Sequence, residues 1–145
     1  VSEFTLRNAP PKPTKSLSHD DVVATLLEIG QLQGKITERE VEIEGKRIDV
    51  AWKRLPKAVP YIVFEVSIAG DLYADLMKLK HAVDMWNSIA VLVTTEERKD
   101  EAQRWIGGAL HEAQQYFRVL TLNEILELYS KKKEYKELES KLGLI

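Results

Sequence analysis

The sequence predicts an α/β protein in which a mixed β-sheet is flanked by helices on both faces. Three patterns support this prediction: a leading amphipathic helix, an antiparallel hairpin after it, and further strands that alternate with helical segments. A helix that connects two strands crosses the sheet and leaves them parallel, whereas a short hairpin turn leaves them antiparallel. Together these connections predict a mixed sheet with the element order α, β, β, β, α, β, α, β, α.

The first helix is expected to begin at Ser18 or Asp20, because either side chain can accept a hydrogen bond from a free backbone amide of the first turn. Apolar residues then recur at helical spacing as far as Ile29. Two glycines follow this stripe and predict that the helix ends near Gln33.

The hairpin and the third strand follow directly. In KITEREVEIEGKRIDVAWKR, apolar and polar residues alternate on both sides of Gly45, a pattern typical of two antiparallel strands joined by a tight turn. Pro56 and Pro60 interrupt the pattern, since proline cannot donate to a strand ladder. The short apolar segment YIVFEV then predicts the third strand.

The second half of the chain predicts alternating helices and strands. Asp71 is expected to cap a helix with an apolar stripe. The stripe consists of Leu72, Leu76, Leu79, Val83 and Trp86. SIAVLVTT predicts a buried strand, a further helix is expected to begin near Thr95, and YFRVLT predicts the last strand. Residues 121–145 are expected to form one broken helix or two consecutive helices.

Length and composition indicate one globular domain. The chain has 145 residues, 44% hydrophobic and 30% charged, which is enough for a single core. We expect residues 17–145 to form this domain, with residues 121–145 as a C-terminal helical extension. Residues 1–16 contain three prolines and no apolar period, which predicts a linker or an extended arm. Further domains of a longer chain, or a homodimer, are the expected protein partners.

Composition also argues against several classes of function. The absence of cysteine excludes disulfides, thiolate metal sites and cysteine nucleophiles. No apolar run approaches the roughly 18 residues of a membrane span, so we expect a soluble cytoplasmic protein without a membrane partner. The sequence contains no phosphate-binding glycine loop, nucleophile elbow or HExxH pair. The net charge of −2 predicts that any DNA contact is made by a local basic patch.

A glutamate inside an apolar strand is the most informative residue of the sequence. Glu65 lies within YIVFEV, where burial of an unpaired carboxylate is costly. Because side chains alternate along a strand, Glu65 shares a face with Ser67, and Asp49 lies on one face of the second hairpin strand. The other face of that hairpin strand is formed by Ile48, Val50 and Trp52. If the two strands are neighbours, Asp49 and Glu65 lie side by side.

Two carboxylates on one face repel each other unless a cation lies between them. Hard oxygen ligands suit Mg²⁺ or Mn²⁺. A metal ion held in this way can activate water and stabilise charge on a phosphate during a displacement reaction. Asp49 and Glu65 therefore predict metal-dependent hydrolysis of phosphodiesters, which is the chemistry of a nuclease.

The motifs RIDVAW and VFEVS, in this element order, resemble the PD-(D/E)XK, or restriction-endonuclease-like, nuclease superfamily. The resemblance extends over about residues 18–120. It implies a restriction-endonuclease-like fold and an Mg²⁺-dependent endonuclease that acts on DNA. Asp49 and Glu65 match the two acidic metal ligands of the family. Glu28 matches a glutamate on the leading helix of some members, such as the Holliday-junction resolvases. Ile48 replaces the proline of the motif.

Ser67 stands where the family pattern has a lysine, the residue expected to orient or activate the attacking water. A serine hydroxyl carries no charge and cannot replace an ammonium group electrostatically. On a helical wheel at about 100° per residue, Lys80 flanks the apolar stripe of its helix, while Lys78 points away from it. We therefore expect Lys80 to replace the missing lysine, with Lys53, which has the parity of Asp49, as the alternative.

Basic residues around the Asp49 strand predict a DNA-binding patch beside the carboxylates. They are Lys46, Arg47, Lys53, Arg54 and Lys57. By contrast, the run from Lys131 to Lys141 interleaves lysines with glutamates, which is typical of a solvated helix. The three histidines lie in unrelated elements and share no metal-binding spacing.

The missing lysine leaves a second hypothesis open, namely a catalytically inactive nuclease-fold module for DNA binding or protein assembly. The two hypotheses differ in geometry. An active site places Asp49, Glu65 and a lysine ammonium within a few ångströms of one point, whereas an inactive site leaves the lysines in solvent.

Overall fold

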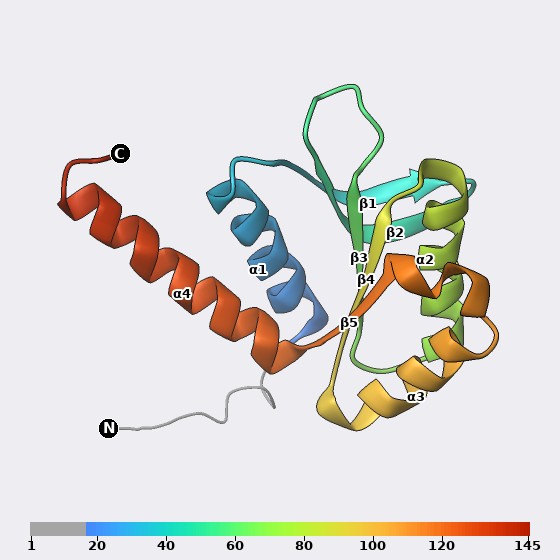
Figure 1. The fold of residues 1–145 in the computed structure, drawn as a ribbon. Coiled ribbons are helices and arrows are strands. Elements are labelled where there is room, and N and C mark those ends of the chain that lie inside the picture. Colours follow the sequence, from blue (N-terminus) through green and yellow to red (C-terminus); the bar gives the residue numbers. More distant parts are fainter. Residues whose placement is uncertain (1–16) are drawn as a thin grey trace.

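The computed structural model describes residues 17–145 (Figure 1). The linker or arm predicted over residues 1–16 lies outside the described residues. The helices are α1 (His19–Leu32), α2 (Leu72–Trp86), α3 (Glu96–Gly107), the 3₁₀ helix η2 (His111–Tyr116) and α4 (Leu122–Lys141). The strands are β1 (Ile36–Ile43), β2 (Lys46–Lys53), β3 (Ile62–Ser67), β4 (Ile89–Thr94) and β5 (Phe117–Thr121). Between residues 17 and 145, no helix combines the length and the apolar character that a membrane crossing requires.

The strands form a single five-stranded sheet in the order β1-β2-β3-β4-β5. β2 is antiparallel to both β1 and β3, whereas β4 is parallel to both β3 and β5. Helices α1 and α4 cover one face of the sheet, and α2, α3 and η2 cover the other (Figure 1). The prediction of an α/β protein with a mixed sheet flanked by helices is therefore confirmed.

Local signals in the sequence fix several element ends where they were expected. Ser18 caps α1 in a reciprocal capping box with Asp21, and Asp71 caps α2. The hairpin turn consists of Glu44 and Gly45, whose φ angles of 46° and 82° are both positive, as a type I′ turn requires.

Two elements differ from the prediction. Residues 122–141 form one continuous helix, α4, instead of a broken helix or two consecutive helices. Thr121 and Glu124 form a capping box at its start, and glycine does not interrupt it until Gly143, so the chain has no local reason to break. The 3₁₀ helix η2 was not predicted, because HEAQQY lacks the apolar period of a helix.

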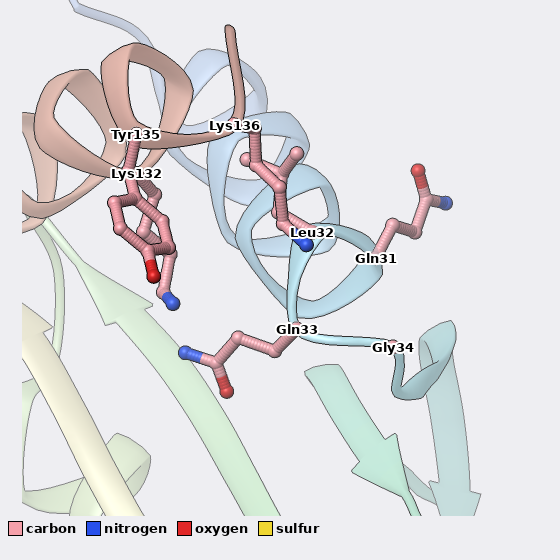
Figure 2. Close-up of a pocket in the computed structure, with 7 residues that line it drawn as sticks. All are labelled: Gln31, Leu32, Gln33, Gly34, Lys132, Tyr135 and Lys136. Carbon is pink, nitrogen blue, oxygen red and sulfur yellow. The ribbon is translucent and has the colours of Figure 1, made fainter. Parts of the chain in front are cut away.

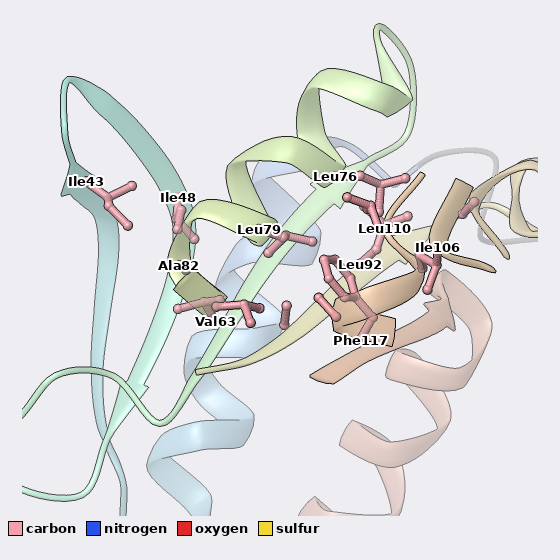
Figure 3. Close-up of a cluster of buried hydrophobic side chains, with 14 of the residues drawn as sticks. Ile43, Ile48, Val63, Leu76, Leu79, Ala82, Leu92, Ile106, Leu110 and Phe117 are labelled. Atoms are coloured by element: carbon pink, nitrogen blue, oxygen red, sulfur yellow. The ribbon is translucent and has the colours of Figure 1, made fainter. Parts of the chain in front are cut away.

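Apolar side chains form one core on each face of the sheet. The core beneath α2, α3 and η2 includes Val63 and Leu79 (Figure 3). The core beneath α1 and the first turns of α4 includes Leu26 and Phe64. The predicted stripe of α2 is buried except at Trp86, which is partly buried against the same core.

The hairpin departs from regular alternation beside Asp49. The β1–β2 register continues on both sides of Glu40 and Asp49, but these two residues form no pair, and Glu40 has a φ of 54°. Ile48 packs into the core beneath α2, whereas Val50 and Trp52 pack into the core beneath α1. The prediction that these three residues share a face is therefore wrong, because the irregularity at Glu40 and Asp49 shifts the alternation of side chains between the two faces of the sheet.

Gly30 allows α1 to approach the hairpin closely. A Cβ atom at Gly30 would lie 2.5 Å from Thr37 Cγ2 and 2.7 Å from Trp52 Nε1. The indole is held in place, because Nε1 donates a hydrogen bond to the carbonyl of Leu26 at 3.2 Å. We expect Gly30→Ala to lower the free energy of unfolding by about 1 to 3 kcal/mol through overpacking.

Urea unfolding measures this effect, and Gly107→Ala is the matched control. Nothing lies within 4 Å of a Cβ atom at Gly107, the last residue of α3. This substitution is expected to change the free energy of unfolding by less than about 1 kcal/mol. Equal losses of stability in the two variants would contradict a steric role for Gly30.

Candidate active site

The carboxylates of Asp49 and Glu65 meet where β2 and β3 separate. Backbone pairing between these strands ends at Val50 and Phe64, and one further step in the same register would pair Asp49 with Glu65. Each carboxylate instead accepts a hydrogen bond from the opposite strand. The amide of Asp49 donates to Glu65 Oε1 at 3.2 Å, and the amide of Val66 donates to Asp49 Oδ2 at 2.8 Å. These hydrogen bonds take the place of the backbone pairing that ends between β2 and β3, and they hold the two side chains beside each other.

Lys78 on α2 brings an ammonium group to this pair. Its Nζ forms an ion pair with Glu65 Oε2 and donates a hydrogen bond to the carbonyl of Arg47 at 3.1 Å. Asp75 Oδ1, one turn earlier on the helix, lies 4.0 Å from the same nitrogen. Glu65, with only 3% of its side chain exposed, therefore links Lys78 to Asp49 through its two carboxylate oxygens.

Burial has a large effect on the acidity of Glu65. It raises the pKa of Glu65 to about 7, and the negative charge of Asp49 raises it as well. The Lys78 ammonium and the amide of Asp49 oppose this shift. Burial lowers the pKa of Lys78, but the hydrogen bond and charge of Glu65 raise it more, so the net shift is upward. Near neutral pH, Glu65 changes between its neutral and ionised forms.

His19, the first residue of α1, contacts the other carboxylate. Its Nε2 lies 3.0 Å from Asp49 Oδ2. Burial lowers the pKa of His19, but the charge and hydrogen bond of Asp49, together with Asp20, raise it more, so the net pKa is raised. This contact could not be predicted from the sequence. Thirty positions separate the two residues, and no local pattern marks a helix N-terminus that lies against a strand.

Ser67, where the sequence resemblance leads us to expect a lysine, is buried and bound by Arg98. The guanidinium Nη1 of Arg98 lies 3.2 Å from both Ser67 Oγ and the Ser67 carbonyl oxygen. Nη2 donates to the carbonyl of Gly70 at 2.7 Å. A cation from α3 thus approaches the Ser67 position, but it is held by oxygens of Ser67 at the end of β3 and of Gly70 in the loop that follows.

The structure pairs the two predicted lysines with surface carboxylates. Lys80 forms an ion pair with Asp84 at 2.8 Å, and Lys53 forms one with Glu38 at 3.1 Å. The expectation that Lys80 or Lys53 reaches the carboxylates is therefore wrong. Lys78 lies on the other flank of the apolar stripe of α2, and that flank faces the fork between β2 and β3.

Glu28 also lies away from the carboxylates. One of its oxygens accepts a hydrogen bond from Tyr129 Oη at 2.8 Å, so this glutamate joins α1 to α4. The structure corrects the expectation that Glu28 supports Asp49 and Glu65, because Glu28 lies nine positions along α1 from His19, which does contact Asp49.

The predicted DNA-binding patch is only partly available. Lys46 is exposed near the hairpin turn, while Arg47 lies 3.6 Å from the carboxylate of Glu40. The guanidinium of Arg54 stacks over the ring of Tyr61 at 3.9 Å. These contacts are weak at a surface and leave both arginines able to meet a phosphate.

The carboxylates fit a magnesium ion through the chemistry of their oxygens. Over residues 17–145, no group of three or more His, Cys, Asp or Glu side chains is placed to hold a metal ion. Mg²⁺ commonly binds through one or two carboxylates and takes its other ligands from water and substrate phosphate. A site of this kind at Asp49 and Glu65 would require the ion to share Glu65 with Lys78, because both Glu65 oxygens are bound within the chain.

Comparisons with protein families, with curated proteins and with solved structures each return no match for this chain. Its resemblance to the PD-(D/E)XK superfamily therefore depends on the sequence motifs, and its function on the geometry of the site.

Proposed function

We propose that this chain is a metal-dependent DNA nuclease of the PD-(D/E)XK type, with a restriction-endonuclease-like fold. The observation that carries the proposal is the meeting of Asp49, Glu65 and the Lys78 ammonium at the fork between β2 and β3. The sequence-based hypothesis of an active nuclease requires two carboxylates and a lysine at one point. Lys78 takes the role expected of Lys80.

Each residue of the fork has a distinct role in this proposal. Asp49 and Glu65 would hold Mg²⁺ or Mn²⁺ through carboxylate oxygens. The bound ion would supply a Lewis acid and an activated water for hydrolysis of a phosphodiester. Lys78 provides a positive charge that can stabilise charge developing on the phosphate. His19 is a positioning residue, because its ring holds one oxygen of Asp49.

A catalytically inactive module is the second candidate, and two observations favour it. Both oxygens of Glu65 are already bound within the chain, one by the amide of Asp49 and the other by Lys78. In addition, Arg98 engages Ser67 at the position of the family lysine. If no metal ion competes with Lys78 for Glu65, the fork is a structural ion pair, and the domain serves DNA binding or protein assembly.

A cleavage assay tests the proposal. Single-stranded, duplex, flapped and branched DNA are incubated with the protein and Mg²⁺ or Mn²⁺. We expect cleavage that stops on addition of EDTA and is lost in Glu65→Ala. Asp84→Ala is the matched control, because Asp84 is an exposed carboxylate on α2 that contacts only Lys80 among the ion pairs of residues 17–145.

Two results would overturn the nuclease proposal. The first is the absence of cleavage on every substrate by folded wild-type protein, and in that case intact DNA binding would support the inactive module. The second is cleavage that survives in Glu65→Ala, because the activity would then belong to another site or to a contaminant.

A further inference from the structure

From Leu128 to its C-cap residue Leu142, α4 carries an apolar stripe that is largely exposed within residues 17–145. The stripe consists of Leu128, Tyr135, Leu138 and Leu142, which are 40%, 63%, 53% and 62% exposed. The buried residues of α4, Leu122 and Ile125, both lie in its first turns. Beyond them the helix continues away from the sheet (Figure 1).

A hollow borders the stripe at Tyr135. It has a volume of about 590 Å³ and lies between α4 and the C-terminal end of α1. Lys132, Tyr135 and Lys136 line it from α4, and the Lys132 and Tyr135 side chains extend into it opposite Gln33 (Figure 2). The chain's own core covers part of Leu128, which lines a hollow with Leu26 and Ile125, but it does not account for Tyr135, Leu138 and Leu142.

The spacing of the stripe is that of a two-helix seam. Leu128, Tyr135 and Leu142 are seven residues apart, and Leu138 follows Tyr135 by three. Intervals of three and four residues place apolar side chains along one line that faces a partner helix. Lys131 lies on the same line, one helical turn before Tyr135, and the aliphatic part of its side chain can cover an apolar neighbour.

Charged residues flank this seam in a self-complementary order. Lys132 and Glu139 lie along one side, and Glu134 and Lys141 lie along the other. In an antiparallel pair of helices, each side of one helix meets the same side of the other. With a two-fold axis between Tyr135 and Leu138, Lys132 lies beside Glu139 of the second copy, and Glu134 lies beside Lys141 of the second copy.

The same axis aligns the apolar residues. Tyr135 meets Leu138 of the second copy, and Leu142 packs on the stem of Lys131. A parallel pair is less favourable: it brings Glu134 against Glu139 of the second copy, although Glu127 would then meet Lys132.

We propose that the α4 stripe binds the α4 stripe of a second copy of this chain, in an antiparallel arrangement with two-fold symmetry. We infer that the partner is a second copy because one two-fold axis brings apolar residues together along the seam and pairs opposite charges on both of its sides. A contact between two helices of this length is small for a protein interface, so the expected dissociation constant is in the micromolar range. The proposal does not depend on the nuclease activity.

Analytical ultracentrifugation of the chain over a range of concentrations tests the dimer. We expect a monomer–dimer equilibrium, and a monomer at all concentrations for Leu138→Glu, which puts a carboxylate against Tyr135. Leu138 is exposed in the monomer, so circular dichroism should show an unchanged fold. Leu55→Glu is the matched control, because Leu55 is 66% exposed but lies in the loop after β2.

Charge exchange distinguishes the two helix orientations. In the antiparallel dimer, Glu134→Lys places a lysine beside Lys141 of the second copy, and the two-fold axis repeats this repulsive pair. The substitution should therefore weaken association by about tenfold. The double variant Glu134→Lys, Lys141→Glu should restore it. Stronger association of Glu134→Lys would indicate the parallel pair and overturn the proposed arrangement. A wild-type chain that stays monomeric up to about 1 mM, the weak limit of specific association, would overturn the dimer itself.

Discussion

Replacement of Lys78 with methionine is expected to lower the rate of metal-dependent DNA cleavage by about 10²- to 10³-fold, whereas Lys80→Met should leave the rate within about twofold of wild type. Lys78 is the lysine whose ammonium contacts Glu65 at the fork, and Lys80 is bound to Asp84 on the surface of α2. Methionine keeps most of the length of the side chain and removes the ammonium group, with its charge and its hydrogen bond to the Arg47 carbonyl. The measurement is single-turnover cleavage at saturating Mg²⁺.

Two controls make this comparison specific. Circular dichroism and urea unfolding show whether either variant has lost its fold, because removal of Lys78 leaves Glu65 buried without a cation and able to take up a proton. Lys78→Arg should retain more activity than Lys78→Met, since it restores a positive charge. A large loss of cleavage in Lys80→Met with normal activity in Lys78→Met would reverse the assignment of the two lysines.

The two lysines illustrate what the sequence could and could not predict about the site. Strand alternation made the meeting of Asp49 and Glu65 predictable, because it places both residues on one face of the sheet once their strands are neighbours. A helical wheel locates Lys78 and Lys80 only relative to the apolar stripe of α2. Which flank of that stripe faces the fork depends on how α2 crosses β3, and the sequence of the helix does not contain this information.

The fold shows the same division between local and long-range signals. Caps such as Asp71 and the turn at Gly45 are decided by neighbouring residues, and both were predicted. The change of facing at Glu40, the contact of His19 with Asp49 and the clamp of Arg98 on Ser67 depend on residues that are distant in the sequence. No periodicity reports such contacts.

We expect the free energy of unfolding to fall as pH rises from 4.5 through 7, because the carboxyl group of Glu65 is buried. Its pKa is raised from 4.5 to about 7 in the folded chain. Below pH 4.5 Glu65 is protonated in both the folded and the unfolded states, and its contribution to stability is fully present. As pH rises from 4.5 to 7, the unfolded chain loses this proton and the folded chain keeps it. Above pH 7 the contribution has been lost, and it amounts to about 3 kcal/mol.

Urea unfolding at several pH values between 4.5 and 8.5, in EDTA, measures this dependence by comparing wild type with Glu65→Gln. The glutamine has the size of the protonated acid but does not ionise, so its advantage over wild type should increase by about 3 kcal/mol across that range. His19 also has a raised pKa and loses its contribution in the same direction, but it is present in both proteins and cancels in the difference. Parallel stability curves for the two proteins would show that Glu65 is ionised throughout, and that Lys78 compensates its burial fully.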